Sequence, residues 1–126
     1  MNNILSMNSL TLAYIGDVVY EMYIREYLVN SGIIKVNNLQ KEAIKYVSAK
    51  GQCKFVTSML DNDFLTEEEI DVFKRARNYK TTSHPKNTDI ITYKFATGFE
   101  AVIGYLYLKK DIKRLEEIIE YCKRGE

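Results

Sequence analysis

The sequence predicts an all-α fold, and three observations support this fold class. Apolar residues recur at helical spacing along most of the 126-residue chain, and residues that begin or end helices separate these stretches. No segment alternates between apolar and polar residues as a half-buried strand does. The length and the 46% hydrophobic content match one core, so we expect residues 1–126 to form a single domain.

Two helices are predicted in the first part of the chain. Residues 10–29 form a mainly apolar stretch that begins after a suitable N-cap, Ser9, and ends at the polar residues 30–32. Asn37 or Asn38 is expected to cap the second helix, because apolar residues at helical spacing follow both.

The middle of the chain predicts two shorter helices. Ser48 and Gly51 are expected to interrupt the second helix before a third one, which ends at an Asp-Asn-Asp turn. Thr66 and Glu69 match a capping box, in which a hydroxyl and a carboxylate three residues apart satisfy the first backbone N–H groups. A fourth helix is therefore expected from this point to about residue 78.

The last part of the chain predicts a long polar connection and two further helices. Residues 79–88 contain the single proline and the single histidine of the sequence, and connections of this length in small domains tend to be functional or mobile. A helix is expected from Asp89 to about Leu108. Asp111 is expected to begin a last, amphipathic helix.

Charge is distributed unevenly along the chain. The net charge is only +1, yet residues 74–94 hold six basic residues against one acidic residue, Asp89. This basic segment favours a polyanionic partner, although a solvated loop with scattered charge explains the count equally well.

Composition excludes several other classes of protein. No apolar run reaches the length of a membrane span, and the first residues lack the features of a secretory signal. The two cysteines, Cys53 and Cys122, lie far apart and match no zinc-binding spacing. We therefore expect a cytoplasmic protein with reduced thiols and no membrane partner.

Two carboxylates interrupt helices that are otherwise apolar. Asp17 lies in the first helix and Glu100 in the helix expected over residues 89–108. Solvated helix edges are the ordinary explanation, because a buried charge is costly unless it is paired or bound to metal. Each helix also carries two small residues three positions apart, which leave room for a neighbouring helix: Ala13 and Gly16, then Ala101 and Gly104.

If these two helices pack together, Asp17 and Glu100 converge. Mg²⁺ is commonly held by one or two carboxylates and several waters, and it can activate water and stabilise the leaving oxygen of a phosphodiester. The basic segment ends shortly before Glu100, so phosphate-binding groups flank a candidate metal ligand. This combination suggests a nuclease without identifying the nucleic acid.

Three sequence blocks resemble the ribonuclease III family, and specifically its compact Mini-ribonuclease III branch. They are residues 12–21 (LAYIGDVVYE), 46–52 (YVSAKGQ) and 75–108, in the expected order. The resemblance implies a ribonuclease III-like endonuclease domain, a helical bundle that dimerises and lacks an appended double-stranded-RNA-binding domain. It further implies Mg²⁺-dependent cleavage of double-stranded RNA, with 5′-phosphate and 3′-hydroxyl ends. The implied task in ribosome biogenesis is maturation of 23S (large-subunit) ribosomal RNA at a stem formed by the precursor's ends.

The resemblance also implies roles for individual residues. Asp17 and Glu100 match the catalytic, metal-binding acids of the family. Ala13 and Thr97 stand where the longer enzymes carry two further acids, which leaves the number of metal ions open. Tyr14 matches an aromatic of the dimer contact, and an ordinary core tyrosine is the equal alternative.

Further candidates have a structural alternative each. Glu21, one turn beyond Asp17, either adds a carboxylate near the metal or pairs with Arg25. His84 precedes Pro85 and is expected in the loop, with a possible phosphate contact, and not as a general base. The candidates for RNA contact lie in or beside the basic segment: Arg75, Arg77, Asn78, Lys80, Lys86, Asn87 and Tyr93.

The sequence thus predicts a homodimeric, Mg²⁺-dependent endoribonuclease that recognises double-stranded RNA mainly by shape and backbone. A ribosomal protein is a candidate additional partner. The alternative is a catalytically silent ribonuclease III-like domain that binds RNA or a ribosomal protein, against which the intact Asp17 and Glu100 argue. A helical interaction module with no RNA role is the more distant alternative.

Overall fold

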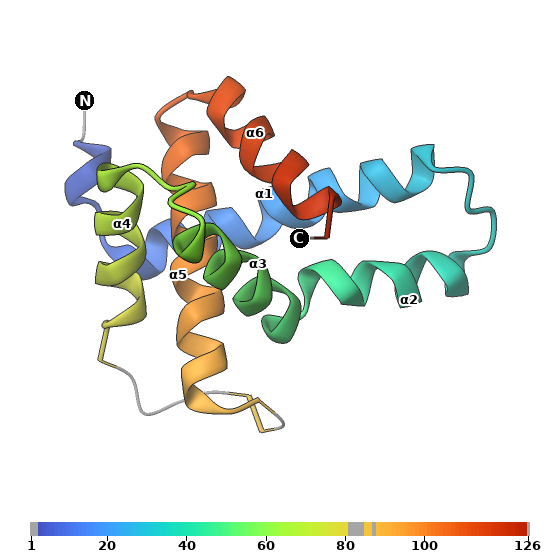
Figure 1. The fold of residues 1–126 in the computed structure, drawn as a ribbon, viewed down its shortest axis with the longest axis horizontal. Helices are drawn as coiled ribbons and strands as arrows, with labels where there is room; N and C mark the ends of the chain where they lie inside the picture. The colour runs from blue at the N-terminus through green and yellow to red at the C-terminus, as the bar shows by residue number, and fades with distance from the viewer. Residues whose placement is uncertain (1–2, 81–84, 87, 126) are drawn as a thin grey trace.

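The computed structural model describes residues 3–80, 85–86 and 88–125, and all of its regular secondary structure is helical (Figure 1). No strand occurs in these residues, so the predicted all-α class is confirmed. A 3-10 turn that the sequence did not predict, η1 (Ile4–Ser6), comes first. Six α-helices follow: α1 (Ser9–Asn30), α2 (Val36–Val47), α3 (Ala49–Asp61), α4 (Glu67–Arg77), α5 (Ile90–Leu108) and α6 (Ile112–Lys123).

Helix α5 is the centre of the molecule. It packs against α1, α3 and α4, and Figure 1 shows it running across α1 between α3 and α4. Every residue from Ala96 to Leu106 is buried except Glu100, which is partly exposed. The apolar character of this segment therefore reflects burial on nearly all sides, and Glu100 is the single acidic side chain in it.

The crossing of α1 and α5 depends on glycine in both helices. A Cβ atom at Gly16 would overlap the backbone carbonyl of Glu100, and one at Gly104 would overlap the carbonyl of Leu12. Only a residue without a side chain permits this approach of two backbones. The small residues therefore allow the close approach of a neighbouring helix that the sequence predicted, and they bring the two acid-bearing helices into direct contact.

The capping box of α4, the break at Ser48 and the starts of the last two helices at Asp89 and Asp111 were predicted correctly. Thr66 and Glu69 form the full capping box of α4, and Ser48 caps α3 by accepting the backbone N–H of Gly51 at 3.0 Å. Asp89 and Asp111 cap α5 and α6 by accepting backbone N–H groups of the first turns.

Two other caps were predicted wrongly. Asn8, and not Ser9, caps α1, because its Oδ1 accepts the backbone N–H groups of residues 10 and 11. Neither Asn37 nor Asn38 caps α2. The carbonyl of Lys35 already accepts the N–H groups of residues 38 and 39, so both asparagines lie inside the first turn.

A sharp bend at Ser48 separates α2 from α3, as expected. Gly51 takes no part in this break, because it lies inside α3. A Cβ at Gly51 would overlap the carbonyl of Lys45, so glycine allows the end of α2 to fold closely over the start of α3. The hydroxyl of Tyr20 donates to the carbonyl of Tyr46 at 2.9 Å, which ties this bend to α1.

An ion pair ties α4 to α6. Glu69 is 3% exposed, and its carboxylate accepts from Nε and Nη2 of Arg114 at 2.8 and 2.9 Å. Arg114 also donates to the carbonyl of Phe64 at 2.6 Å. Because both charges are paired and hydrogen-bonded, their burial is tolerated.

In the described part of the chain, no helix has the length and hydropathy that crossing a membrane requires. Cys53 and Cys122 are both free thiols, as expected.

Candidate active site

Two carboxylates converge where α1 crosses α5. Asp17 projects from α1 and is exposed, whereas Glu100 projects from α5 and is partly buried. Asp17 lies close enough to Glu100 to raise the pKa of the Glu100 carboxyl. The structure therefore brings together the two acids that the sequence placed on separate apolar helices.

The surroundings of Glu100 disfavour its negative charge. Burial, as the largest cause, and the neighbouring Asp17 together raise the pKa of Glu100 from 4.5 to about 8. A hydrogen bond from Gln52 acts in the opposite direction, and no basic side chain of the described residues contributes to the pKa. The pair thus carries negative charge that the surrounding protein does not neutralise.

A divalent cation fits this donor set. Carboxylate oxygens are hard ligands, and Mg²⁺ is commonly held by only one or two of them, with waters completing the coordination. Within the described residues, no group of three or more acidic, histidine or cysteine side chains is arranged to hold a metal. The site therefore offers two protein carboxylates.

Ala13 and Thr97, which stand where the longer enzymes carry two further acids, are both buried. Ala13 is 6% exposed and packs in the core. Thr97 is 9% exposed, and its hydroxyl donates to the carbonyl of Tyr93 at 3.0 Å within the same helix. Neither residue supplies a ligand for a metal, so Asp17 and Glu100 remain the acids of the crossing.

Gln52 is a site residue that the sequence analysis did not single out. It is 2% exposed, and its Nε2 donates to Oε2 of Glu100 at 3.3 Å. A signal was present: Gln52, Phe55, Val56 and Met59 follow the i, i+3, i+4, i+7 spacing of a buried helix face. A glutamine on such a face predicts a buried amide that needs partners.

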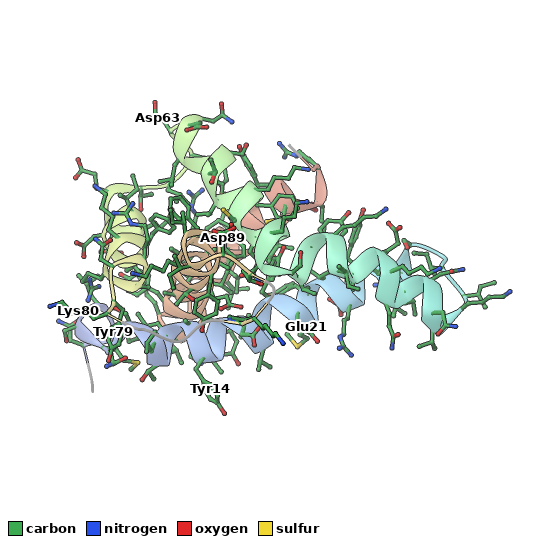
Figure 2. The ribbon with its side chains drawn as sticks, turned by 90° about the horizontal axis from the view of Figure 1, so that it is seen from below. Tyr14, Glu21, Asp63, Tyr79, Lys80 and Asp89 are labelled. Carbon is green, nitrogen blue, oxygen red and sulfur yellow. The ribbon has the colours of Figure 1, made fainter. Side chains whose placement is uncertain are left out.

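Glu21 forms an ion pair with Arg25, with Nη2 and Oε2 2.5 Å apart, so the structural alternative is the one observed. Glu21, labelled in Figure 2, also borders a hollow of about 470 Å³ beside Asp17 on α1. The hollow is lined by Asp17, Val18, Glu21, Met22 and Arg25.

Two of the arginines proposed for RNA contact already have partners within the protein. Nε of Arg75 lies 3.3 Å from Oδ2 of Asp71, and Arg75 is partly buried. The guanidinium of Arg77 lies 5.5 Å from the ring centre of Phe73, and its Nε donates to Asn78 at 3.1 Å. Both arginines therefore contribute to packing at the end of α4.

The remaining candidates for RNA contact differ in exposure. Asn78, Lys80 and Lys86 are exposed, whereas Tyr93 is partly buried. Figure 2 shows Lys80 beside Tyr79 at one end of the molecule. Asn87 and His84 lie outside the described residues.

Tyr14 is not a core residue. Its exposed fraction is 80%, and Figure 2 shows it projecting from α1 away from the rest of the molecule. Val18 and Met22 follow at intervals of four residues and are 63% and 57% exposed. These three side chains form one apolar stripe on the outer face of α1, called here the α1 stripe.

Comparison with known proteins agrees with this arrangement. The family profile described as the ribonuclease III domain matches residues 10–111. A protein named Mini-ribonuclease 3 from Enterococcus faecalis is 48% identical over 100% of this chain and 97% of its own length. Its namesake from Streptococcus pneumoniae is 46% identical over 92% and 91%. The chain belongs to the Mini-ribonuclease III family.

A solved structure supports the membership at the level of the fold. The X-ray structure of a protein from Fusobacterium nucleatum matches this structure with a TM-score of 0.83. The two sequences are 33% identical, and the match covers 95% of this chain and 94% of the other. Membership of the Mini-ribonuclease III family makes the chain an endoribonuclease. The ribonuclease III family generally uses a divalent metal, acts on double-stranded RNA and typically dimerises.

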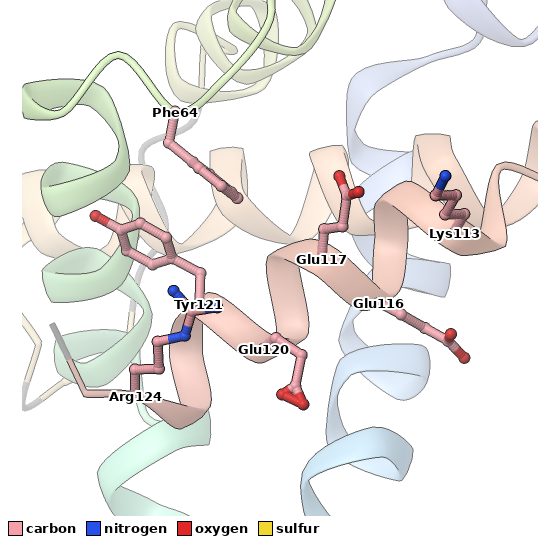
Figure 3. A pocket seen from close by; sticks show the side chains of 7 residues that line it. All are labelled: Phe64, Lys113, Glu116, Glu117, Glu120, Tyr121 and Arg124. Carbon is pink, nitrogen blue, oxygen red and sulfur yellow. The ribbon is translucent and has the colours of Figure 1, made fainter.

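A second hollow lies on α6. It measures about 400 Å³, and Figure 3 shows its lining side chains along α6, with Phe64 facing them from the segment between α3 and α4. Three glutamates line it against two basic residues: Glu116, Glu117, Glu120, Lys113 and Arg124. Glu117 pairs with Arg114 at 3.1 Å and Glu120 with Lys123 at 3.6 Å. Most of the acidic charge of this hollow is therefore compensated within the protein, and the carboxylate pair at the α1–α5 crossing remains the candidate active site.

Proposed function

We propose that this endoribonuclease is Mg²⁺-dependent and acts as a homodimer, with Asp17 and Glu100 as its catalytic and metal-binding residues. The observation that carries the proposal is the convergence of these two side chains where α1 crosses α5. Their uncompensated charge and hard oxygen ligands match what Mg²⁺ requires.

The side chains of the site have separate tasks in this proposal. When bound, the cation supplies an activated water and stabilises charge on the leaving oxygen of the phosphodiester. Asp17, which is exposed, is open to solvent and to a bound phosphate, whereas Glu100 is fixed within the buried segment of α5. The expected products carry 5′-phosphate and 3′-hydroxyl ends.

Contacts to RNA are proposed for the end of α4 and the connection that follows it. Asn78, Lys80 and Lys86 are exposed, so their side chains can reach the backbone of a duplex, although Asn78 also accepts a hydrogen bond from Nε of Arg77. For Arg75, Arg77 and Asn87 the proposal rests on the family resemblance and the local positive charge. Recognition of double-stranded RNA through its phosphates and 2′-hydroxyls suits such a surface.

The α1 stripe is the proposed dimer contact. Tyr14, Val18 and Met22 are apolar and exposed on one helix face, and burying such a face against a second copy removes it from water. Val18 and Met22 also line the hollow beside Asp17, so the proposed interface adjoins the proposed catalytic site.

The proposed substrate is a stem of the 23S ribosomal RNA precursor, and a ribosomal protein is a proposed additional partner. Support for both comes from the family resemblance, because the geometry of the site identifies only the chemistry. This substrate would place the protein in the cytoplasm.

Single-turnover cleavage of a long RNA duplex tests the catalytic roles. Asp17→Asn and Glu100→Gln preserve side-chain volume and remove one charge each, so we expect both to fold, to bind duplex and to lose cleavage by orders of magnitude. Saturating enzyme separates chemistry from binding. The matched control is Glu21→Gln, which removes a nearby carboxylate that is already paired with Arg25 and should retain most activity.

Three outcomes would contradict the proposal. Rates of Asp17→Asn or Glu100→Gln close to the parent rate would show that the carboxylate is not catalytic. Parental cleavage in EDTA would show that no divalent ion takes part. Binding of duplex without cleavage by the unmodified protein would support the catalytically silent alternative.

A further inference from the structure

Gln52 is a buried polar residue whose presence the packing of the core does not explain. It occupies the first turn of α3 and is 2% exposed. An apolar side chain of similar size would fill the same space without burying an amide, and burying a polar group is unfavourable unless it is hydrogen-bonded. The contacts of this amide therefore indicate what it does.

The bend between α2 and α3 fixes the position of Gln52. Ser48 caps α3 by accepting the N–H of Gly51 at 3.0 Å. The carbonyl of Lys45 lies so close to Gly51 that no side chain would fit at this position. The cap at Ser48 and the close packing of Gly51 against α2 therefore fix the backbone next to Gln52. Its side chain extends from this fixed point into the core toward α5.

One nitrogen of Gln52 joins the bend to the carboxylate pair. Nε2 donates to the carbonyl of Val47 at 3.0 Å and to Oε2 of Glu100 at 3.3 Å. Both partners are acceptors, so the amide can be oriented in only one way, because the opposite orientation would place Oε1 against two oxygens. Val47 therefore orients the amide, and the amide orients Glu100.

The second polar atom of the same amide has no partner. Oε1 of Gln52 is buried and accepts no hydrogen bond from the described residues. A half-satisfied amide in a core is unfavourable, so the stability of the fold does not by itself explain Gln52. The position adjoins Glu100, which points to a role in the carboxylate pair.

We propose that Gln52 is a positioning residue, whose amide holds the Glu100 carboxylate in the orientation needed to share a divalent cation with Asp17. This inference rests on the proposed function of Asp17 and Glu100. Hydrogen bonds to metal-ligating carboxylates fix the orientation of the ligand, and losing such a partner typically weakens metal affinity or activity by about 10- to 100-fold. Gln52 would then link the bend to metal affinity.

The test compares Gln52→Met with Gln40→Met. Methionine has nearly the shape of glutamine but cannot donate a hydrogen bond, and Gln40 is an exposed residue of α2. Mg²⁺ alone is titrated into the RNA-free protein, and the rise in melting temperature reports its affinity. We expect the half-saturating Mg²⁺ concentration to rise about 10-fold or more for Gln52→Met and to stay at the parent value for Gln40→Met.

A second variant and a second measurement complete the test. Gln52→Asn keeps an amide but shortens it by one methylene, so it should also weaken Mg²⁺ binding, even if Gln52→Met fails to fold. In single-turnover cleavage, both variants should recover with added Mg²⁺, whereas Glu100→Gln should not. A merely structural role would lower the melting temperature and leave the Mg²⁺ dependence unchanged.

The possible failures are distinguishable. Parental Mg²⁺ affinity in the folded Gln52 variants, together with an inactive Glu100→Gln, would overturn the role of Gln52 and leave the proposed function intact. Parental activity of Glu100→Gln would overturn the proposed function itself, and with it this inference.

Discussion

At the scale of single residues, the central feature is an acid kept in an unfavourable position. Glu100 interrupts a buried stretch of α5, and Asp17 faces it from α1. Folding without a cation therefore brings together two groups that repel each other when both are ionised. Such an arrangement favours metal binding over stability, because a divalent ion removes the repulsion that the protein leaves uncompensated.

The raised pKa of Glu100 predicts how the stability of the metal-free protein depends on pH. Its ordinary value is 4.5 and its folded value is about 8, so the folded state holds more protons than the unfolded state between these values. Stability is therefore highest near the lower value and falls as pH rises toward about 8. Melting temperatures in EDTA across this pH range should decrease for the parent more steeply than for Glu100→Gln.

Added Mg²⁺ should reverse this trend, because the ion binds the ionised carboxylate. The rise in melting temperature produced by Mg²⁺ should increase with pH in the parent and be small at every pH in Glu100→Gln. Identical pH profiles of parent and variant in EDTA would show that Glu100 is not the group with the raised pKa.

At the scale of helices, the crossing of α1 and α5 determines whether the carboxylates meet. Alanine in place of Gly104 gains about 1 kcal/mol of helix propensity. The added Cβ would, however, overlap the carbonyl of Leu12, a backbone atom that cannot rotate away. Overpacking of this kind costs roughly 1–3 kcal/mol, so we expect Gly104→Ala to lower the free energy of unfolding by an amount near the upper end of that range.

Urea denaturation measures this loss, and Gly98→Ala provides a graded control. A Cβ at Gly98 would lie 2.5 Å from the ring of Phe73 and 3.0 Å from its carbonyl, whereas one at Gly104 would lie closer still to the carbonyl of Leu12, so the loss for Gly98→Ala should be smaller. Cleavage by Gly104→Ala should also fall under conditions where the variant is folded, because α1 and α5 must move apart. Equal stability of the two variants would show that the backbone contact is not limiting.

How much of this arrangement the sequence predicts depends on the range of the interaction. Local signals were reliable: the capping box at Thr66 and Glu69 and the aspartate caps of α5 and α6 all involve residues within one turn. The small residues Gly16 and Gly104 also predicted close packing correctly. The start of α2 was missed because the carbonyl of Lys35 competes with the asparagine side chains, which a residue pattern does not reveal.

The contacts of Gln52 could not be predicted in the same way. Its burial was readable from helical spacing, but its partner Glu100 lies 48 residues away and reaches it only through the packing of α3 on α5. The positions of Asp17 and Glu100 were predicted as a pair because each breaks an apolar helix. Gln52 does not stand out in the same way from the residues around it, so only the folded structure connects Gln52 to Asp17 and Glu100.

At the scale of the whole molecule, the α1 stripe is the feature that a monomer leaves unexplained. Large exposed apolar side chains aligned on one face indicate an interaction surface. In a two-fold symmetric dimer the same patch is used by both copies, so each substitution acts twice in one interface. Such a dimer would also bring the two candidate sites together along one duplex, since the stripe adjoins the hollow beside Asp17.

Val18→Glu tests this assembly, because Val18 lies at the middle of the stripe and is 63% exposed. The side chain does not support the fold of the monomer, and glutamate is a good helix former, so the variant should fold. Two buried, unpaired charges in one interface should shift the dimer to monomers at micromolar concentration. Light scattering should report about twice the chain mass of 14.7 kDa for the parent and the chain mass for the variant.

Ile44→Glu is the matched control, since Ile44 is 60% exposed on α2 and lies outside the stripe. It should remain dimeric, which excludes a general effect of adding charge to an apolar surface. Monomeric Val18→Glu should retain Mg²⁺ binding, because Asp17 and Glu100 belong to one chain, but it should lose efficient duplex cleavage. A Val18→Glu protein that stays dimeric with parental affinity would show that copies meet elsewhere, and a monomer that cleaves duplex at the parent rate would show that one site acts alone.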